Sequence, residues 1–243
     1  MNFQGFKPRA FTFLFDVYTN DSKQWYEAHK GEYDTFIKEP FFDMIFDLTP
    51  TVRTVDFDIM TEPKRCLSRI YRDARYARGK TKYRNSAWIT FHCPTNDEVS
   101  YPEFFVEITD SFCRWGMGAY AMQAKEMAEL RKFIAENPDE FKKIIKPFSK
   151  NKGLHIAADY YKKTHRDSPE VLPEGLEEWF QIKSFYMTSG NLPCDVMADG
   201  KIVETIARDF EQLGGFYNLL KNIISNLAAE NYSKQLSALN FFE

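Results

Sequence analysis

Apolar residues recur with the helical period near the start of the chain. Residues 20–22, Asn-Asp-Ser, form a good helix N-cap, and the apolar and aromatic positions behind it are three and four residues apart: Trp25, Tyr26, His29, Tyr33, Phe36 and Ile37. This spacing predicts an amphipathic helix of about four or five turns. Pro40 ends or kinks that helix, and the apolar run 41–48 predicts a second helix that leads to Pro50.

The period changes to two between residues 52 and 117, where β-branched and aromatic residues occur in short runs bounded by turn residues. The connections between these runs are short, which favours an antiparallel sheet. We therefore predict strands at about residues 56–61, 66–71, 87–93, 104–109 and 112–117.

The helical period returns in the second half of the chain. It predicts helices at about 123–136, onward to 146, at 173–180 and at 201–227, the last kinked or split by Gly214-Gly215, and it leaves a strand at 182–188. Residues 147–164 are less regular. Because no linker or repeat divides the chain, we expect residues 1–243 to form one α+β domain: an antiparallel or mixed β-sheet with helices packed on it and at both ends of the chain.

Charge and cysteine content narrow the class of protein. A net charge of −3 argues against a general polyanion binder, so any contact with nucleic acid would be local. Four widely spaced cysteines without a C-x-x-C pair favour free thiols in a reducing compartment. With no secretory signal and no apolar run of about 18 residues, we expect a cytoplasmic protein without a membrane partner.

One stretch, which we call the basic segment, concentrates the positive charge. Residues 69–85 read R-I-Y-R-D-A-R-Y-A-R-G-K-T-K-Y-R-N, with seven cationic residues against one acid, between two predicted strands. Its length and its single glycine do not fit a simple turn. Gly79-Lys80-Thr81 resembles the end of a phosphate-binding loop, but Ala74 stands where that motif needs its first glycine, so we exclude a nucleotide P-loop.

The chemistry of the basic segment predicts a binding site for an anion. A guanidinium group presents a planar fork of donors that matches carboxylate or phosphate oxygens. We expect the ligand to be a phosphorylated small molecule or the backbone of a nucleic acid, with tyrosines as the walls of the site and an aspartate that orients the arginines. The predicted ligand-binding residues are Arg69, Tyr71, Arg72, Asp73, Arg75, Lys80, Lys82 and Tyr83.

The string R-I-Y-R-D-x-R-Y-x-x-x-K-T-x-Y, residues 69–83, resembles the signature of the domain of unknown function 2461 family. Further similar stretches are the Asn-Asp turn and W-Y-E-A-H-K at 20–30, the G-x-G-x-Y turn at 116–120, Leu130-Arg131 and the K-S-F strand at 183–185. The resemblance implies membership of that family over most of the chain and supplies no activity. Lys82 stands where the family usually has Pro, and Arg78 replaces a residue that is more often Lys or Asp.

Two other classes of function remain open from the residues. In the first, the protein is structural or binds a partner, and Asp73 with acids of neighbouring strands, such as Glu103, Glu107 or Asp110, pairs the arginines internally. In the second, it is a metal-dependent phosphoester hydrolase that uses Asp73 and Glu107. The four histidines show no zinc-binding spacing, so we expect no zinc site, and no motif indicates a cofactor. The oligomeric state stays undetermined.

Overall fold

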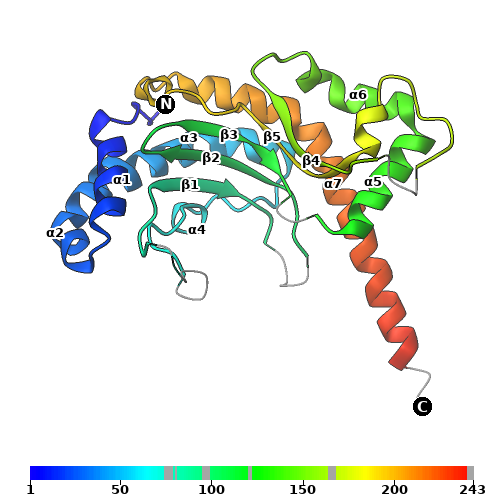
Figure 1. Cartoon of the computed structure of the whole chain (residues 1–243), viewed down its shortest axis with the longest axis horizontal. Coiled ribbons are helices and arrows are strands. Elements are labelled where there is room, and N and C mark those ends of the chain that lie inside the picture. Colours follow the sequence, from blue (N-terminus) through cyan, green and yellow to red (C-terminus); the bar gives the residue numbers. More distant parts are fainter. Residues whose placement is uncertain (74–78, 80, 95–98, 120–121, 164–167, 240–243) are drawn as a thin grey trace.

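An antiparallel sheet of five strands lies at the centre of the structure, a computed structural model in which residues 1–73, 79, 81–94, 99–119, 122–163 and 168–239 are described. The spatial order is β1-β2-β3-β5-β4, and each neighbouring pair is antiparallel (Figure 1). The strands are β1 (Ser86–Phe91), β2 (Glu103–Thr109), β3 (Cys113–Gly118), β4 (His155–Tyr160) and β5 (Ile182–Thr188). The predicted α+β class is confirmed.

Helices cover one face of the sheet and bury its apolar residues. Alternate residues of β1 and β2, among them Ile89 and Phe104, are fully buried on this face. The ring of Phe104 lies 4.7 Å from Phe210 and 5.1 Å from Tyr217, both on the long helix α7 (Ile202–Leu239). The apolar residues at every second position of the strands thus pack against the apolar face of helix α7.

The N-terminal helices include one, α1 (Pro8–Asn20), that precedes the two predicted ones. It is followed by α2 (Lys23–Tyr33), a π-helical segment (Asp34–Lys38) and α3 (Glu39–Val55). The Ser22 hydroxyl accepts a hydrogen bond from the Trp25 amide, which confirms the predicted N-cap. Helix α3 continues through Pro50 instead of ending before it, contrary to the prediction. In the turn of α3 that precedes Pro50, the Ile45 carbonyl accepts a hydrogen bond from the Thr49 hydroxyl.

The first two predicted strands were wrong. Residues 56–61 have no strand conformation, and a short helix, α4 (Pro63–Cys66), occupies the start of the second prediction. Pro63 is at the first helical position, where its fixed φ and missing amide favour a helix start. Only isolated bridges, Leu67 with Ile89 and Tyr71 with Tyr83, connect the following residues to neighbouring segments within the described chain.

The second half departs from prediction at two places. Strand β4 lies in the stretch predicted to be irregular, because its mixed exposure gives no two-residue alternation. Helix α7 runs unbroken through Gly214-Gly215, where a kink or break was predicted. A Cβ at Gly214 would lie 2.9 Å from Val55 Cγ2 of α3, so the glycine lets these two helices pack closely. The other elements are α5 (Ala124–Glu136), α6 (Pro138–Ser149) and 3-10 helices at Glu177–Phe180 and Cys194–Ala198.

The distal part of α7 extends away from the rest of the molecule (Figure 1). Within the residues that the structure describes, neither this helix nor any other combines the length and apolar character needed to cross a membrane.

Candidate functional site

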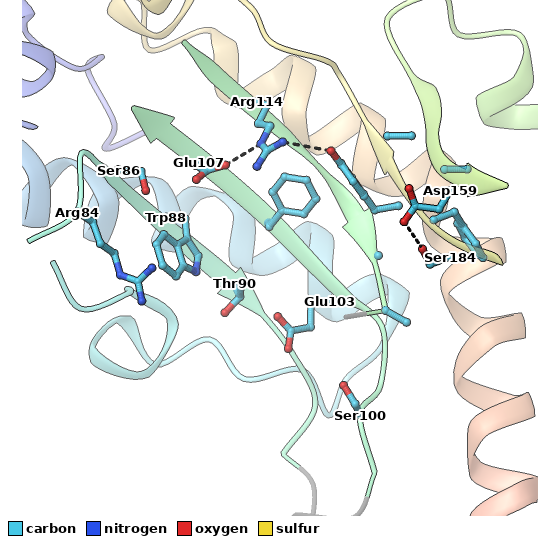
Figure 2. A pocket seen from close by; sticks show the side chains of 17 residues that line it. Arg84, Ser86, Trp88, Thr90, Ser100, Glu103, Glu107, Arg114, Asp159 and Ser184 are labelled. Atoms are coloured by element: carbon cyan, nitrogen blue, oxygen red, sulfur yellow. Dashed lines mark hydrogen bonds and ion pairs between the residues drawn. The ribbon is translucent and has the colours of Figure 1, made fainter. Parts of the chain in front are cut away.

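The face of the sheet that the helices leave open carries a groove of about 990 Å³. Outward-facing residues of β1 and β2 alternate with the buried ones and form its floor, including Trp88, Phe105 and Glu107. Figure 2 shows Arg84 and Trp88 at one side of this face, and Asp159 with Ser184 at the opposite side. A concave site of this size is typical of small-molecule binding.

The middle of the groove is ordered by a paired charge and by two glycines. Arg114 Nε donates to Glu107 Oε2 at 2.6 Å, and its Nη1 donates to the Tyr186 hydroxyl at 3.2 Å. A Cβ at Gly116 would lie 1.9 Å from the Met187 carbonyl oxygen, and one at Gly118 would lie 2.6 Å from Tyr186 Cβ. Only glycine therefore lets β3 and β5 approach so closely here. The glycines predicted to form a turn belong to β3.

Glu103, at the start of β2, points into the same groove (Figure 2). Its side chain is half-buried, and within the described chain it makes no hydrogen bond or ion pair. Burial raises the pKa of this carboxyl above its usual range. A carboxyl group with a raised pKa in an open groove is a candidate for contact with a ligand. At the far side, the Ser184 hydroxyl donates to Asp159 Oδ2 at 3.0 Å.

A smaller recess of about 250 Å³ adjoins the groove, and three arginines are among the residues that line it. They are Arg65 of α4, Arg69 and Arg84, and Asp73 belongs to the same lining. The recess shares three lining residues with the groove: Arg84, Trp88 and Thr90. An anion held in the recess could therefore extend into the groove along Trp88.

Arg72 and Arg84 carry guanidinium groups that no carboxylate neutralises among the described residues. The Nε atoms of both are buried, and neither has a hydrogen-bond partner. The Arg84 guanidinium lies over the Trp88 ring, 4.9 Å from its centroid. Burial and the nearby positive charge of Arg72 lower the pKa of Arg84, and Glu107 opposes this effect. Two like charges with unused donors are thus held close together, which is costly without an anion.

Backbone hydrogen bonds hold Arg72 and Arg84 on the two sides of a short two-stranded ribbon, residues 70–72 and 82–84. The Arg72 amide donates to the Lys82 carbonyl at 2.7 Å, and the Arg84 amide donates to the Ile70 carbonyl at 2.9 Å. These bonds bring the two ends of the basic segment together. The side-chain pair therefore belongs to a fixed backbone and not to a free loop end.

Asp21 anchors this ribbon to the N-terminal helices. Its Oδ1 accepts hydrogen bonds from the Lys82 amide at 2.6 Å and the Tyr83 amide at 3.0 Å. Asp21 ends α1 in the left-handed conformation, with φ of 44°, a position that Asp tolerates better than most residues. The Tyr83 ring packs 5.2 Å from that of Tyr26 on α2. The Asn-Asp turn and the basic segment are thus in direct contact.

The predicted site residues fall into three groups. Arg69, Tyr71 and Asp73 line the recess, and Arg72 lies close enough to Arg84 to lower its pKa. Lys82 and Tyr83 contribute amides to the Asp21 contact, and Tyr83 is buried against Tyr26 instead of forming a wall. Two further predicted residues, Arg75 and Lys80, lie outside the described residues.

Sequence reasoning missed Arg65, Arg84 and Trp88 as site residues. Arg84 belongs to the basic segment, and positions 84, 86, 88 and 90 share one face of the β1 ladder. This two-residue period was visible in the sequence. Arg65 carried no such sign, because it lies in α4, a helix that the sequence did not predict.

Two of the acids proposed as internal partners of the arginines, Glu107 and Asp110, have other contacts. Glu107 pairs with Arg114. Asp110 accepts hydrogen bonds from the Asn85 side chain at 3.1 Å and from the Ser111 hydroxyl at 3.2 Å. In the described part of the chain, no group of three or more His, Cys, Asp or Glu side chains is placed to hold a metal ion.

A second polar cluster lies on the helix-covered side of the sheet. Asp56, after α3, accepts hydrogen bonds from Lys221 at 2.5 Å and from the Tyr217 hydroxyl at 3.1 Å, and Cys93 Sγ lies 3.1 Å from the same carboxylate oxygen. Burial raises the pKa of Asp56, but the hydrogen bonds from Lys221 and Cys93 outweigh burial and lower the pKa overall. This cluster joins α3 and α7 and has matched charges.

The comparisons with known proteins relate most of the chain to one family. The sequence model of a family described as "Conserved hypothetical protein (DUF2461)" matches residues 9–218. The matched region includes the Asn-Asp turn, the basic segment, the five strands and the first part of α7, up to residue 218. A search of curated proteins finds no match.

Proposed function

Since the chain belongs to the DUF2461 family of conserved hypothetical proteins, whose description names no activity, we propose a function from the site itself. The protein binds a ligand that carries a phosphate or carboxylate group. The anionic group enters the recess between Arg65, Arg69 and Arg84, and the remainder of the ligand lies in the groove along Trp88.

The observation that carries this proposal is the unused donor pair, Arg72 Nε and Arg84 Nε. A buried donor without an acceptor costs about 1–3 kcal/mol, and more when the group is charged. Arg84 lines the open recess, and Arg72 lies close enough to lower the pKa of Arg84. An oxyanion bound in the recess would offer an acceptor to the Arg84 guanidinium and would reduce the repulsion between it and Arg72.

Two observations favour this function over an internal ion-pair network. Glu107 and Asp110, both proposed as partners of the arginines, contact Arg114 and Asn85 instead. The recess is also open to solvent, and its volume is large enough for a phosphate group. A metal-dependent phosphoester hydrolase has less support, because its second proposed ligand, Glu107, is already paired at 2.6 Å.

Thermal shift and calorimetric titrations with inorganic phosphate and pyrophosphate test the proposal. They compare the wild-type protein with Arg84→Met, which keeps an unbranched side chain as far as the position of Arg Nε and removes the charge. Arg208→Met is the matched control, because it makes the same change in net charge. Arg208 is an exposed arginine of α7 and lies far in sequence from the residues of the recess. Each titration is repeated at low and high salt to separate a specific site from general screening.

We expect wild type and Arg208→Met to gain thermal stability with increasing pyrophosphate and Arg84→Met to gain none. Equal responses from all three proteins would contradict the proposal, and so would the absence of any response from wild type to both anions.

A further inference from the structure

The groove beyond the recess indicates what the rest of the ligand looks like. We propose that the ligand is a mononucleotide whose base carries an amino group: the phosphate binds at Arg84, the base lies flat in the groove, and Glu103 accepts a hydrogen bond from the amino group. This inference rests on the proposed function, because it takes the arginine-lined recess as the phosphate site.

The first argument is the polarity of the groove along β1 and β2. The Arg84 guanidinium lies over Trp88, and Trp88 is paired with Glu107 in the register of these strands. Glu103 lies four residues from Glu107 on the same face, which is about 14 Å along the strand. A cationic group and a hydrogen-bond acceptor are therefore separated by the length of a compact ligand with different groups at its two ends.

The second argument is the aromatic surface between these ends. Trp88 of β1 and Phe105 of β2 line the groove between Arg84 and Glu103, and the Phe105 ring centroid lies 6.2 Å from that of Tyr186. Partly exposed rings allow a planar group to stack on them. A phosphorylated sugar alone would leave this aromatic surface unused.

The third argument is the state of Glu103. Unlike Glu107 and Asp159, which have partners in the groove, Glu103 has none among the described residues. A half-buried carboxyl group that faces an open groove can accept a hydrogen bond from a bound ligand. The exocyclic amino group of adenine or cytosine supplies such a donor at the edge of a planar ring, opposite the phosphate end.

The experiment uses the full-length protein and three related ligands. Ribose 5-phosphate has the phosphate and no base, purine riboside 5′-monophosphate adds the ring without an amino group, and adenosine 5′-monophosphate adds the amino group. Calorimetry measures their dissociation constants for wild type, for Glu103→Met and for Arg208→Met as the control. Glu103→Met fills the same space and removes the acceptor.

For wild type and Arg208→Met, we expect the ring to improve affinity about tenfold over ribose 5-phosphate through stacking, and the amino group to improve it about tenfold again. For Glu103→Met, we expect the second gain to vanish and the first to remain. Because this variant removes an unpaired carboxyl group, it should fold with unchanged or higher thermal stability, which excludes misfolding as the cause.

Two results would overturn the inference and leave the proposed function standing: inorganic phosphate binds through Arg84 while the three ligands bind equally, or the amino group improves binding equally in wild type and Glu103→Met. A single-stranded oligonucleotide that binds more than tenfold tighter than the mononucleotide would also overturn it, in favour of a nucleic-acid ligand. If neither phosphate nor any nucleotide binds, the proposed function fails together with the inference.

Discussion

The sheet separates two polar clusters, one in which the buried charges have partners and one in which buried donors have none within the described chain. On the helix-covered side, Asp56 receives hydrogen bonds from Lys221 and Tyr217 and has Cys93 within hydrogen-bond distance. On the open side, the Nε donors of Arg72 and Arg84 are equally inaccessible to solvent and have no acceptor. The first arrangement joins two helices. The second is the arrangement that we propose to receive an anion.

The comparison predicts the largest loss of stability in the matched cluster. Lys221→Met leaves the buried Asp56 carboxylate without its cationic partner, and we expect the free energy of unfolding to fall by about 3 kcal/mol. Chemical denaturation measures this change. Lys125→Met, at an exposed position of α5, should change it by less than about 0.5 kcal/mol. Equal small effects for both variants would show that the matched cluster is not structural.

Asp21→Ala should cause the next largest loss of stability, because Asp21 connects the N-terminal helices with the basic segment. It removes the acceptor of the Lys82 and Tyr83 amides, and we expect a loss of about 2 kcal/mol together with weaker binding of pyrophosphate. Asp21→Asn keeps an acceptor oxygen and tolerates the left-handed backbone, so it should recover most of both losses. Weakened stability with intact pyrophosphate binding would show that the anchor does not position the arginines.

Arg84→Met should show the reverse pattern from Lys221→Met. Removal of an unsatisfied, partly buried charge should leave the free energy of unfolding unchanged or raise it by about 1 kcal/mol. The same variant should lose the stabilisation by pyrophosphate. A clear loss of stability in the absence of any anion would assign Arg84 to an internal network and would remove the contrast between the two clusters.

Glu103→Met sharpens the comparison through its pH dependence. Burial raises the pKa of Glu103 above 4.5, so the folded wild type binds a proton more tightly than the unfolded chain. The wild type is therefore penalised at neutral pH, and the penalty is lost as the pH falls through the folded pKa towards 4.5. The stability advantage of Glu103→Met should be largest at neutral pH and should disappear in acid, and Glu103→Gln should behave alike. Thermal unfolding across this pH range measures the difference.

The periodic parts of the fold could be predicted from the sequence. Alternation in 87–91 and 104–109 gave β1 and β2, and the Ser22 cap gave the start of α2. Alternation failed for 56–61, where a chain turn after α3 places Asp56 against Lys221 instead of in a strand. It also failed for 66–71, where α4 ends at Cys66 and isolated bridges to Ile89 and Tyr83 follow. In the first stretch a contact distant in sequence accompanies the local conformation, and in the second the helix start at Pro63 displaces the strand.

The candidate site was predicted only in part, for a similar reason. The basic segment was conspicuous as a charge block, but the adjoining groove consists of residues from all five strands, whose order follows from long-range pairing. The contact between Asp21 and residues 82–83 spans about 60 positions and has no local sequence pattern. Arg84 and Trp88 could have been placed together by their two-residue period, whereas Glu103 could be joined to them only through the register of β1 and β2.

The most direct test of the central claim observes the two Nε–H groups themselves. ¹⁵N NMR of the arginine side chains, with Arg72 and Arg84 assigned through their lysine variants, reports whether each Nε–H has an acceptor. The account predicts that both resonances shift together on addition of pyrophosphate and that Arg208 does not respond. Resonances of Arg72 and Arg84 that stay unchanged at saturating pyrophosphate, or that already show a strong hydrogen bond in the free protein, would contradict it.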